Sequence, residues 1–177
     1  MAVLEIITAP HPVLERPARP VEPDEFGPEL AKRVSDMAET MYAAPGVGLA
    51  APQVSDPRRI VVLDPGEPED RGRRFFALIN PKIISRSERM IPWLETCLSV
   101  PEFEIEIQRH YQVQLEWQDV ADGSTRTGWF EEFEAVIVQH EIDHLQGTIL
   151  LDRSSRFKRN RYLKKVSKAK KKDQVIA

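Results

Sequence analysis

Residues Val136 to Gly147, which read VIVQHEIDHLQG, decide the fold of this chain. His140 and His144 are four residues apart, so in a helix their side chains lie one above the other on one face. Two imidazoles at that spacing can bind one metal ion without bending the backbone. Glu141 points beside such an ion, where a carboxylate can accept a proton from an activated water molecule. The apolar residues before His140 indicate that the helix lies in the core.

A catalytic metal site of this kind needs a third protein ligand, and the sequence after the helix offers none. No Glu follows Glu141 and no His follows His144, which argues against two common metallopeptidase patterns. In one of them a histidine stands three residues after the glycine, but Leu150 occupies that position here. The third ligand must therefore lie upstream. Composition alone favours Cys97, the only cysteine, as a small buried hydrophobic residue.

Length and composition indicate one globular domain spanning residues 1–177, because this length is too short for two comfortable cores. Hydrophobic residues make up 41% of the chain and charged residues 30%, an ordinary balance for a globular protein. No apolar run approaches the roughly 20 residues that a membrane span needs. The N-terminal residues lack the features of a signal or transit peptide. With a single cysteine, the expected location is a reducing cytoplasm.

The charge is unevenly distributed along the chain. The net charge is -3 at pH 7, yet residues 153–172 contain 11 Lys and Arg and no acidic residue. The other 14 of the 25 basic residues stand against all 28 acidic residues. An acidic body with a basic tail indicates a polyanionic partner for the tail, although such a run is more often a solvated face.

Apolar periodicity and turn residues predict an α+β fold, with antiparallel strands around a helix near 130–147. An N-terminal helix is expected from Phe26 to about Tyr42, with Asp24 as its N-cap. The dipeptide Asp122-Gly123 predicts a hairpin turn. A basic helix is expected at about 155–172, docked through Phe157, Tyr162, Leu163 and Val166. Short strands are expected at 3–8, 59–63, 75–79, 82–87, 104–107, 112–117, 125–129 and 149–151.

Three segments together resemble the signature motifs of peptide deformylases. They are GVGLAAPQ at 46–53, ETCLS at 95–99 and QHEIDH at 139–144, in the order and at a spacing compatible with that family. From composition alone, the first segment would be a turn whose small residues let the backbone approach a ligand. The resemblance covers nearly the whole chain. It implies that Cys97 joins His140 and His144 as the third metal ligand, which leaves a fourth position open for water.

The resemblance also implies the reaction, which is removal of the formyl group from the N-terminal formyl-methionine of new polypeptides. Glu141 would transfer the proton, while the side-chain amide of Gln53 and the backbone N–H of Leu98 would bind the oxyanion. Glu95 would pair with Arg109 and hold the loop that carries the cysteine. The positions implied to contact or support the substrate are Gly46, Val47, Gly48, Glu95, Phe133, Val136 and Ile137.

The donor set suits one divalent ion, with Fe2+ favoured in the cell by the resemblance and Zn2+, Ni2+ or Co2+ also suited. The expected partners are formyl-methionyl nascent peptides and, through the basic helix, the ribosome. DNA is not expected because the acidic body would repel a duplex, and neither is a membrane. The default oligomeric state is a monomer.

Two positions depart from the family pattern. Thr96 stands where the family usually has Gly, and Glu104 stands where relatives often carry a basic residue near the substrate, so peptide preference beyond methionine is open. Three other functions are weighed against this one. They are a metallopeptidase that cuts internal peptide bonds, a metal- or ribosome-binding protein without catalysis, and a nucleic-acid-binding module. Retention of Glu141 and Gln53 argues against the second of these, because a purely structural site needs neither.

Overall fold

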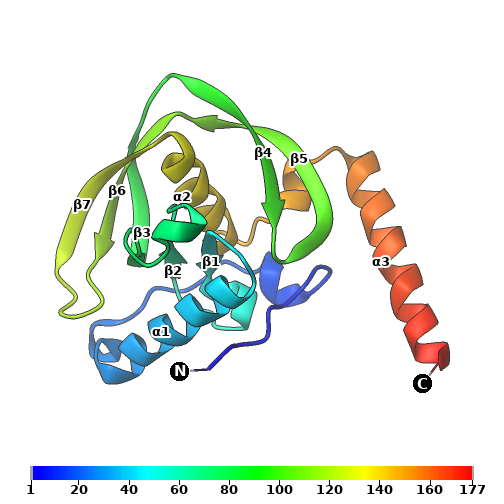
Figure 1. Ribbon diagram of the computed structural model, residues 1–177, viewed down its shortest axis with the longest axis horizontal. Helices are drawn as coiled ribbons and strands as arrows, with labels where there is room; N and C mark the ends of the chain where they lie inside the picture. The colour runs from blue at the N-terminus through cyan, green and yellow to red at the C-terminus, as the bar shows by residue number, and fades with distance from the viewer. Residues whose placement is uncertain (1, 177) are drawn as a thin grey trace.

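A computed structural model describes residues 2–176, and the side chains of all of these except residues 68 and 170–176. In this part of the chain, a five-stranded antiparallel sheet of order β1-β2-β3-β6-β7 and a separate β4-β5 hairpin lie around helix α2, with α1 and α3 outside them (Figure 1). The α+β prediction is confirmed. The elements are α1 (Pro28–Ala43), β1 (Gly48–Ala50), β2 (Ile60–Leu63), β3 (Phe76–Arg86), β4 (Met90–Cys97), β5 (Val100–His110), β6 (Gln112–Gln118), β7 (Thr125–Glu131), α2 (Glu132–Leu145) and α3 (Arg156–Ile176).

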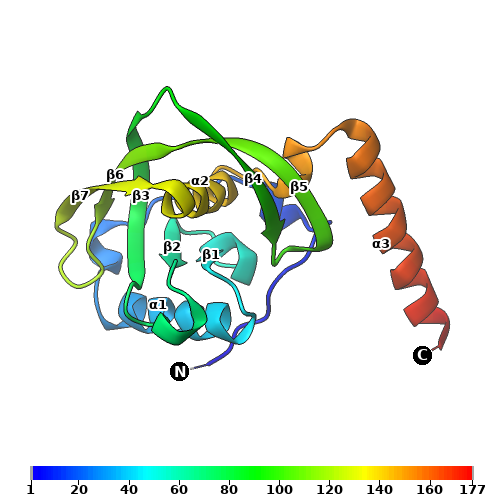
Figure 2. The same ribbon diagram turned by 45° about the horizontal axis from the view of Figure 1, so that its top comes forward.

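Strand β2 is buried along its whole length because helices cover both faces of the sheet at this point. Val61 and Leu63 belong to the core cluster shared with α2, whereas Ile60 and Val62 belong to the cluster shared with α1. Alternate residues of a strand point to opposite faces, so this run is continuously apolar. Figure 2 shows the strand between the two helices.

Helix α2 is the central helix of the fold, as the sequence predicted. Ten of its 14 residues are buried, so polar side chains on it lie inside the protein and need partners there. It follows β7 directly and packs against β1, β2, β5, β6 and β7. Gly147, whose φ is +72°, follows the helix in a backbone conformation that favours glycine.

Several predicted element boundaries were wrong. Residues 3–8 form no strand; isolated bonds hold them instead, such as Ile7 N–H to the Gln53 carbonyl at 2.7 Å. The two strands expected at 75–79 and 82–87 form one strand, β3, which continues through a register irregularity at Asn80. The side chain of Asn80 bonds the backbone N–H and carbonyl of Val21, at 2.8 and 2.9 Å.

The predicted start of the N-terminal helix and the predicted strand at 149–151 also differ from the structure. The N-cap of α1 is Gly27 followed by Pro28, while Asp24 lies in a short 3-10 turn, Pro23–Glu25. The expected strand at 149–151 gives way to a 3-10 turn, Leu150–Arg153, because the Asp152 carboxylate accepts the Ile149 N–H at 2.9 Å.

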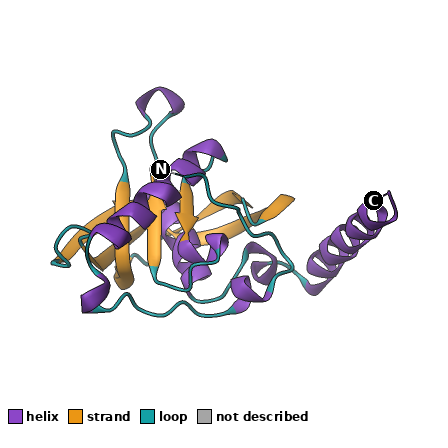
Figure 3. Cartoon of the chain, turned by 90° about the horizontal axis from the view of Figure 1, so that it is seen from below, coloured by secondary structure: helices purple, strands orange, loops and turns teal. Residues whose placement is uncertain are grey.

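Helix α3 extends away from the rest of the chain, as Figure 3 shows from below. Tyr162 is buried and its ring meets that of Phe103 at 5.5 Å, and Leu163 and Val166 pack beside it. Phe157 is 76% exposed, so its expected docking role was wrong. Five residues of helix turn the side chain about 140° away from Tyr162, whereas Val166 is only about 40° away. Among the described residues, no helix is both long and apolar enough to cross a membrane.

Candidate active site

A cleft of about 550 Å³ opens between the β4-β5 hairpin, α2 and the segment before β1. All three sequence motifs contribute to it, although they lie far apart in the chain. Every residue predicted to bind substrate lines this cleft, and so do Cys97, His140 and Glu141. The lining residues are Pro45, Gly46, Val47, Gly48, Gln53, Trp93, Leu94, Glu95, Thr96, Cys97, Leu98, Pro101, Phe133, Val136, Ile137, His140 and Glu141.

Cys97, His140 and His144 lie close together, and the first two line the cleft. Their ligand atoms are all within 4.8 Å of one another, and Cys97 Sγ is 3.3 Å from His144 Nε2. The cysteine ends β4, where a register irregularity turns the strand toward Val100 of β5. One sulfur and two imidazole nitrogens are a donor set that divalent transition metals bind.

The surroundings of the two histidines fit a metal site. The ring of His140 is oriented by Glu95, whose Oε2 lies 2.7 Å from Nδ1, so Nε2 is left for a ligand. Burial lowers the pKa of His144 well below its usual value, whereas at His140 the hydrogen bonds with Cys97 and Glu95 outweigh burial and raise the pKa well above its usual value. The Nδ1 of His144 meets no hydrogen-bond partner within the described part of the protein.

Glu95 and Arg109 form the pair that the sequence predicted. Arg109 donates from Nε to Glu95 Oε1 at 2.6 Å and from Nη2 to Oε2 at 2.9 Å. Burial alone would raise the pKa of Glu95, but the bonds from Arg109 and His140 outweigh it and lower the pKa to about 2. The carboxylate therefore stays charged and orients His140 from a position in the lining of the cleft.

Glu141 is a buried carboxyl group that follows His140 on α2 and lines the same cleft. Burial raises its pKa to about 7, and its Oε2 has no hydrogen-bond partner among the described residues. Its position depends on Gly48, because a Cβ there would lie 2.5 Å from Glu141 Oε1. A carboxyl group with a pKa near neutral can both accept and donate a proton at physiological pH.

The side-chain amide of Gln53 is held in one orientation. Its Oε1 accepts the Ala50 N–H at 2.8 Å, and its Nε2 donates to Ser99 Oγ at 3.1 Å. The same nitrogen is 3.8 Å from Cys97 Sγ, so the donor faces the candidate metal site. Sequence reasoning did not assign a role to Ser99, because its contact is with a residue 46 positions away.

The apolar side of the cleft includes a residue that the sequence analysis missed. Trp93 stacks on Phe133, with ring centroids 5.2 Å apart and planes at 22°. Trp93, Glu95 and Cys97 are every second residue of β4, so their side chains point to the same side of the strand. Recognising residues 91–99 as a strand would have placed Trp93 in the cleft.

Comparison with known proteins gives consistent results. The Polypeptide deformylase family model matches residues 3–160. A peptide deformylase of Phenylobacterium zucineum is 43% identical over 169 residues, covering 95% of this chain and 97% of the relative. One from Desulfotalea psychrophila is 42% identical over 168 residues, with the same two coverages.

Solved structures agree with these relatives. A crystal structure of peptide deformylase from Ehrlichia chaffeensis matches with a TM-score of 0.87 and 36% identity, covering 98% of this chain and 99% of that one. One from Legionella pneumophila matches with a TM-score of 0.86 and 33% identity, covering 98% of each. The chain therefore belongs to the polypeptide deformylase family, and it is a metal-dependent hydrolase that removes the formyl group from the N-terminal formyl-methionine of newly made polypeptides.

Proposed function

We propose that Cys97, His140 and His144 hold one divalent ion and that Glu141 is the acid-base group of deformylation. The supporting observation is that the three candidate ligand atoms lie within 4.8 Å of one another. The buried carboxyl group of Glu141, from the helix that carries both histidines, lines the adjoining cleft. When bound, the ion supplies Lewis-acid chemistry that polarises the formyl carbonyl and acidifies water. The individual substitutions Cys97→Ser, His140→Ala and His144→Ala should each lower metal content, measured by elemental analysis after anaerobic purification.

Glu141 would accept the proton of the attacking water and pass it to the leaving amine nitrogen. Its burial supports this role, because a pKa of about 7 serves both directions of transfer. Gln53 Nε2 and the Leu98 backbone N–H would donate to the oxyanion. Leu98 is positioned beside Gly46, where an added Cβ would lie 2.8 Å from Leu98 Cδ1.

Selectivity for formyl-methionine would come from the shape and polarity of the cleft. Val47, Phe133, Val136 and Ile137 would contact the flexible, apolar methionine side chain. Gly46 and Gly48 would let the substrate backbone come close, and Glu95 would support the site through His140. A formyl group carries only hydrogen beyond its carbonyl, so a tight site excludes acetyl. Formate release from a formyl-Met peptide, with no hydrolysis of the matched acetyl-Met peptide, tests this assignment.

Fe2+ is the ion we propose in the cell, with Zn2+, Ni2+ or Co2+ as replacements that the same donors accept. The Cys/His donor set and the family membership support this choice. Elemental analysis of protein purified without oxygen should find iron. We also propose a cytoplasmic monomer whose residues 1–177 form one domain, and light scattering at several concentrations tests the monomer.

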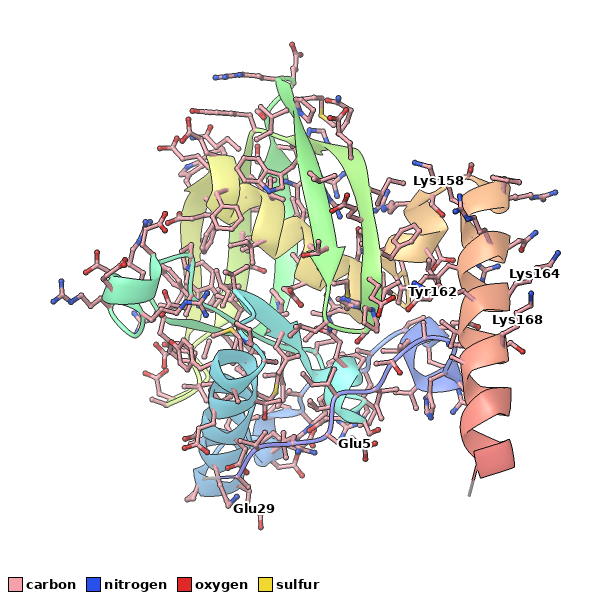
Figure 4. The ribbon with its side chains drawn as sticks, turned by 45° about the vertical axis from the view of Figure 1, so that its right-hand side comes forward. Glu5, Glu29, Lys158, Tyr162, Lys164 and Lys168 are labelled. Atoms are coloured by element: carbon pink, nitrogen blue, oxygen red, sulfur yellow. The ribbon has the colours of Figure 1, made fainter. Side chains whose placement is uncertain are left out.

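The basic helix α3 would be the contact with the ribosome. Lys164 and Lys168 point away from the body while Tyr162 faces it, as Figure 4 shows. Phosphate contacts release counterions, so binding should weaken steeply as salt increases. Changing Lys158, Lys164 and Lys168 to Gln should reduce co-sedimentation with ribosomes. A variant with the same charge change at Lys32, Arg73 and Lys82 is the control, and equal co-sedimentation of the two variants contradicts the proposal.

A further inference from the structure

A chain of charged contacts leads from His140 to the segment just before α3. It begins at His140 Nδ1, which lies 2.7 Å from Glu95 Oε2. Arg109 donates to the same carboxylate from Nε and Nη2. Its third guanidinium nitrogen, Nη1, donates to Asp143 Oδ2 at 2.8 Å. Glu95, Arg109 and Asp143 are all buried, so their mutual contacts replace water. The support of His140 therefore continues beyond the Glu95–Arg109 pair.

Arg153 closes this chain of contacts. Its guanidinium donates from Nε to Asp143 Oδ2 at 3.1 Å and from Nη2 to Oδ1 at 2.5 Å. Arg153 is the last residue of the 3-10 turn Leu150–Arg153 and is not part of α2 or the cleft lining. Its side chain is 43% exposed, so it joins the buried contacts to the surface near the start of α3.

Arg153 adds a second guanidinium to this chain of contacts. The buried part of the chain contains two carboxylates, Glu95 and Asp143, and one guanidinium, Arg109. Without Arg153, Arg109 would be the remaining cationic partner of Asp143 and would also serve Glu95. Removing one partner of a buried ion pair is strongly destabilising. Because Arg109 bonds both carboxylates, a shift of Arg109 toward Asp143 would alter its bonds to Glu95.

We propose that Arg153 is a positioning residue for the metal site. It acts through Asp143 and Arg109 to fix Glu95, and Glu95 in turn fixes the ring of His140. The inference rests on the proposed role of His140 as a metal ligand. It extends that role to a residue 13 positions further along the chain, outside the three sequence motifs. An exposed ion pair that merely tethered the tail would leave the metal site unaffected.

The test uses the full-length protein loaded with Co2+ and compares Arg153→Gln, Arg153→Lys, Asp143→Asn and the Asp143→Asn/Arg153→Gln double variant. Arg156→Gln, an exposed residue at the start of α3, is the matched control. The measurements are the rate of Co2+ release to a chelator, the Co2+ absorption spectrum, and kcat and KM for a formyl-Met peptide. Thermal unfolding of each metal-free protein shows whether the variant is folded.

Arg153→Gln should release Co2+ about threefold to tenfold faster, which is below the 10–100-fold typical of groups that touch a ligand directly. Its kcat should fall while KM stays near the original value, and Arg153→Lys should recover part of the loss. The double variant should release the metal no faster than Asp143→Asn alone, because both changes break one path. Arg156→Gln should match the unaltered protein.

Release from folded Arg153→Gln at the unaltered rate would overturn the proposal, and so would an effect that adds fully to that of Asp143→Asn. Equal acceleration in Arg156→Gln would also overturn it, by assigning the effect to the charge of the tail. His140→Ala separates this inference from the function on which it rests. If His140→Ala retains Co2+ normally, the proposed ligand set fails; if it loses Co2+ while Arg153→Gln does not, only the role of Arg153 fails.

Discussion

At the scale of single residues, the space around Glu141 is set by the absence of a side chain at Gly48. The Glu141 carboxyl group occupies the volume that a Cβ at position 48 would need. The first and third motifs therefore meet in space, and the small residues of the first motif have a physical reason. Gln53, from the same motif, is likewise held by Ala50 and Ser99.

Gly48→Ala should lower kcat by about 100-fold, because a displacement of about 1 Å at a reacting group has an effect of that size. The added Cβ would lie 2.5 Å from Glu141 Oε1, so the carboxyl group must move. Metal content should be unchanged, since Gly48 is not among the proposed ligands. Steady-state kinetics together with elemental analysis measure both quantities. Turnover equal to that of the unaltered enzyme would mean that Glu141 needs no fixed position.

Gln53→Ala should lower kcat by about 10²–10³-fold if its amide donates to the oxyanion. Ser99→Ala should have a smaller effect in the same direction, because Gln53 keeps its bond from Ala50. The control measurement is KM, which should change little in either variant. A Ser99→Ala loss as large as that of Gln53→Ala would mean that Ser99 itself acts on the substrate.

Sequence patterns identified the residues of the cleft whose chemistry is visible in a motif, such as His140 and Glu141. They missed Trp93, Ser99 and Arg153, because these act through contacts between segments far apart in the chain. The role of Cys97 came only with the family resemblance. Composition alone favoured a core residue, and Cys97 is indeed buried.

At the scale of elements, the cleft depends on how α2 ends and how the chain turns afterwards. Gly147 has φ +72°, and an added Cβ would lie 2.8 Å from the Glu15 carbonyl oxygen. That close approach places the chain after α2 against the N-terminal segment. The following turn then carries Arg153 back to Asp143 on α2.

Gly147→Ala should reduce the free energy of unfolding by more than Gly123→Ala does. Both glycines have φ near +70°, so alanine at either position costs of order 1–3 kcal/mol in backbone strain. At Gly123 the nearest atom to an added Cβ is a Phe26 ring carbon at 3.4 Å, whereas at Gly147 it is backbone. Urea denaturation measures the difference between the two variants. Equal losses would show that the chain around Glu15 moves aside without cost.

Element types followed from the sequence better than element ends did. The apolar run before His140 correctly predicted a buried helix, because its residues face the core on several sides. The expected strand at 149–151 failed because Asp152 caps a 3-10 turn there. Phe157 failed as a docking residue because neighbouring apolar residues of α3 face different directions. Such outcomes depend on tertiary partners that local patterns do not contain.

At the scale of the whole molecule, ion pairs of the buried Asp56 join helix α1 to the segment before β2. Asp56 accepts Arg33 Nε from α1 at 2.8 Å and Arg58 Nη2, before β2, at 2.6 Å. Burial would raise the pKa of Asp56, but the hydrogen bonds from Arg58 and Arg33 outweigh it and the net shift is downward. A lowered pKa means that the folded state favours the charged carboxylate.

This lowered pKa predicts a loss of stability in acid. The contribution of Asp56 is present above its unfolded-state pKa of about 4 and is lost as pH falls through the lower folded-state value. Asp56→Asn should therefore reduce the free energy of unfolding by about 1–3 kcal/mol at pH 7 and by less at pH 3. Chemical denaturation at both pH values measures this, and an equal loss at both would contradict it.

The central claim is that Glu141 moves the proton while Cys97, His140 and His144 hold the metal. Glu141→Gln keeps the size and polarity of the side chain but removes its base. Metal stoichiometry and formate release from a formyl-Met peptide, measured on the same anaerobic preparation, test the claim directly. We expect one ion per chain, as in the unaltered protein, and a rate about 10²–10⁴-fold lower. Retained turnover, or loss of the metal along with the activity, would contradict it.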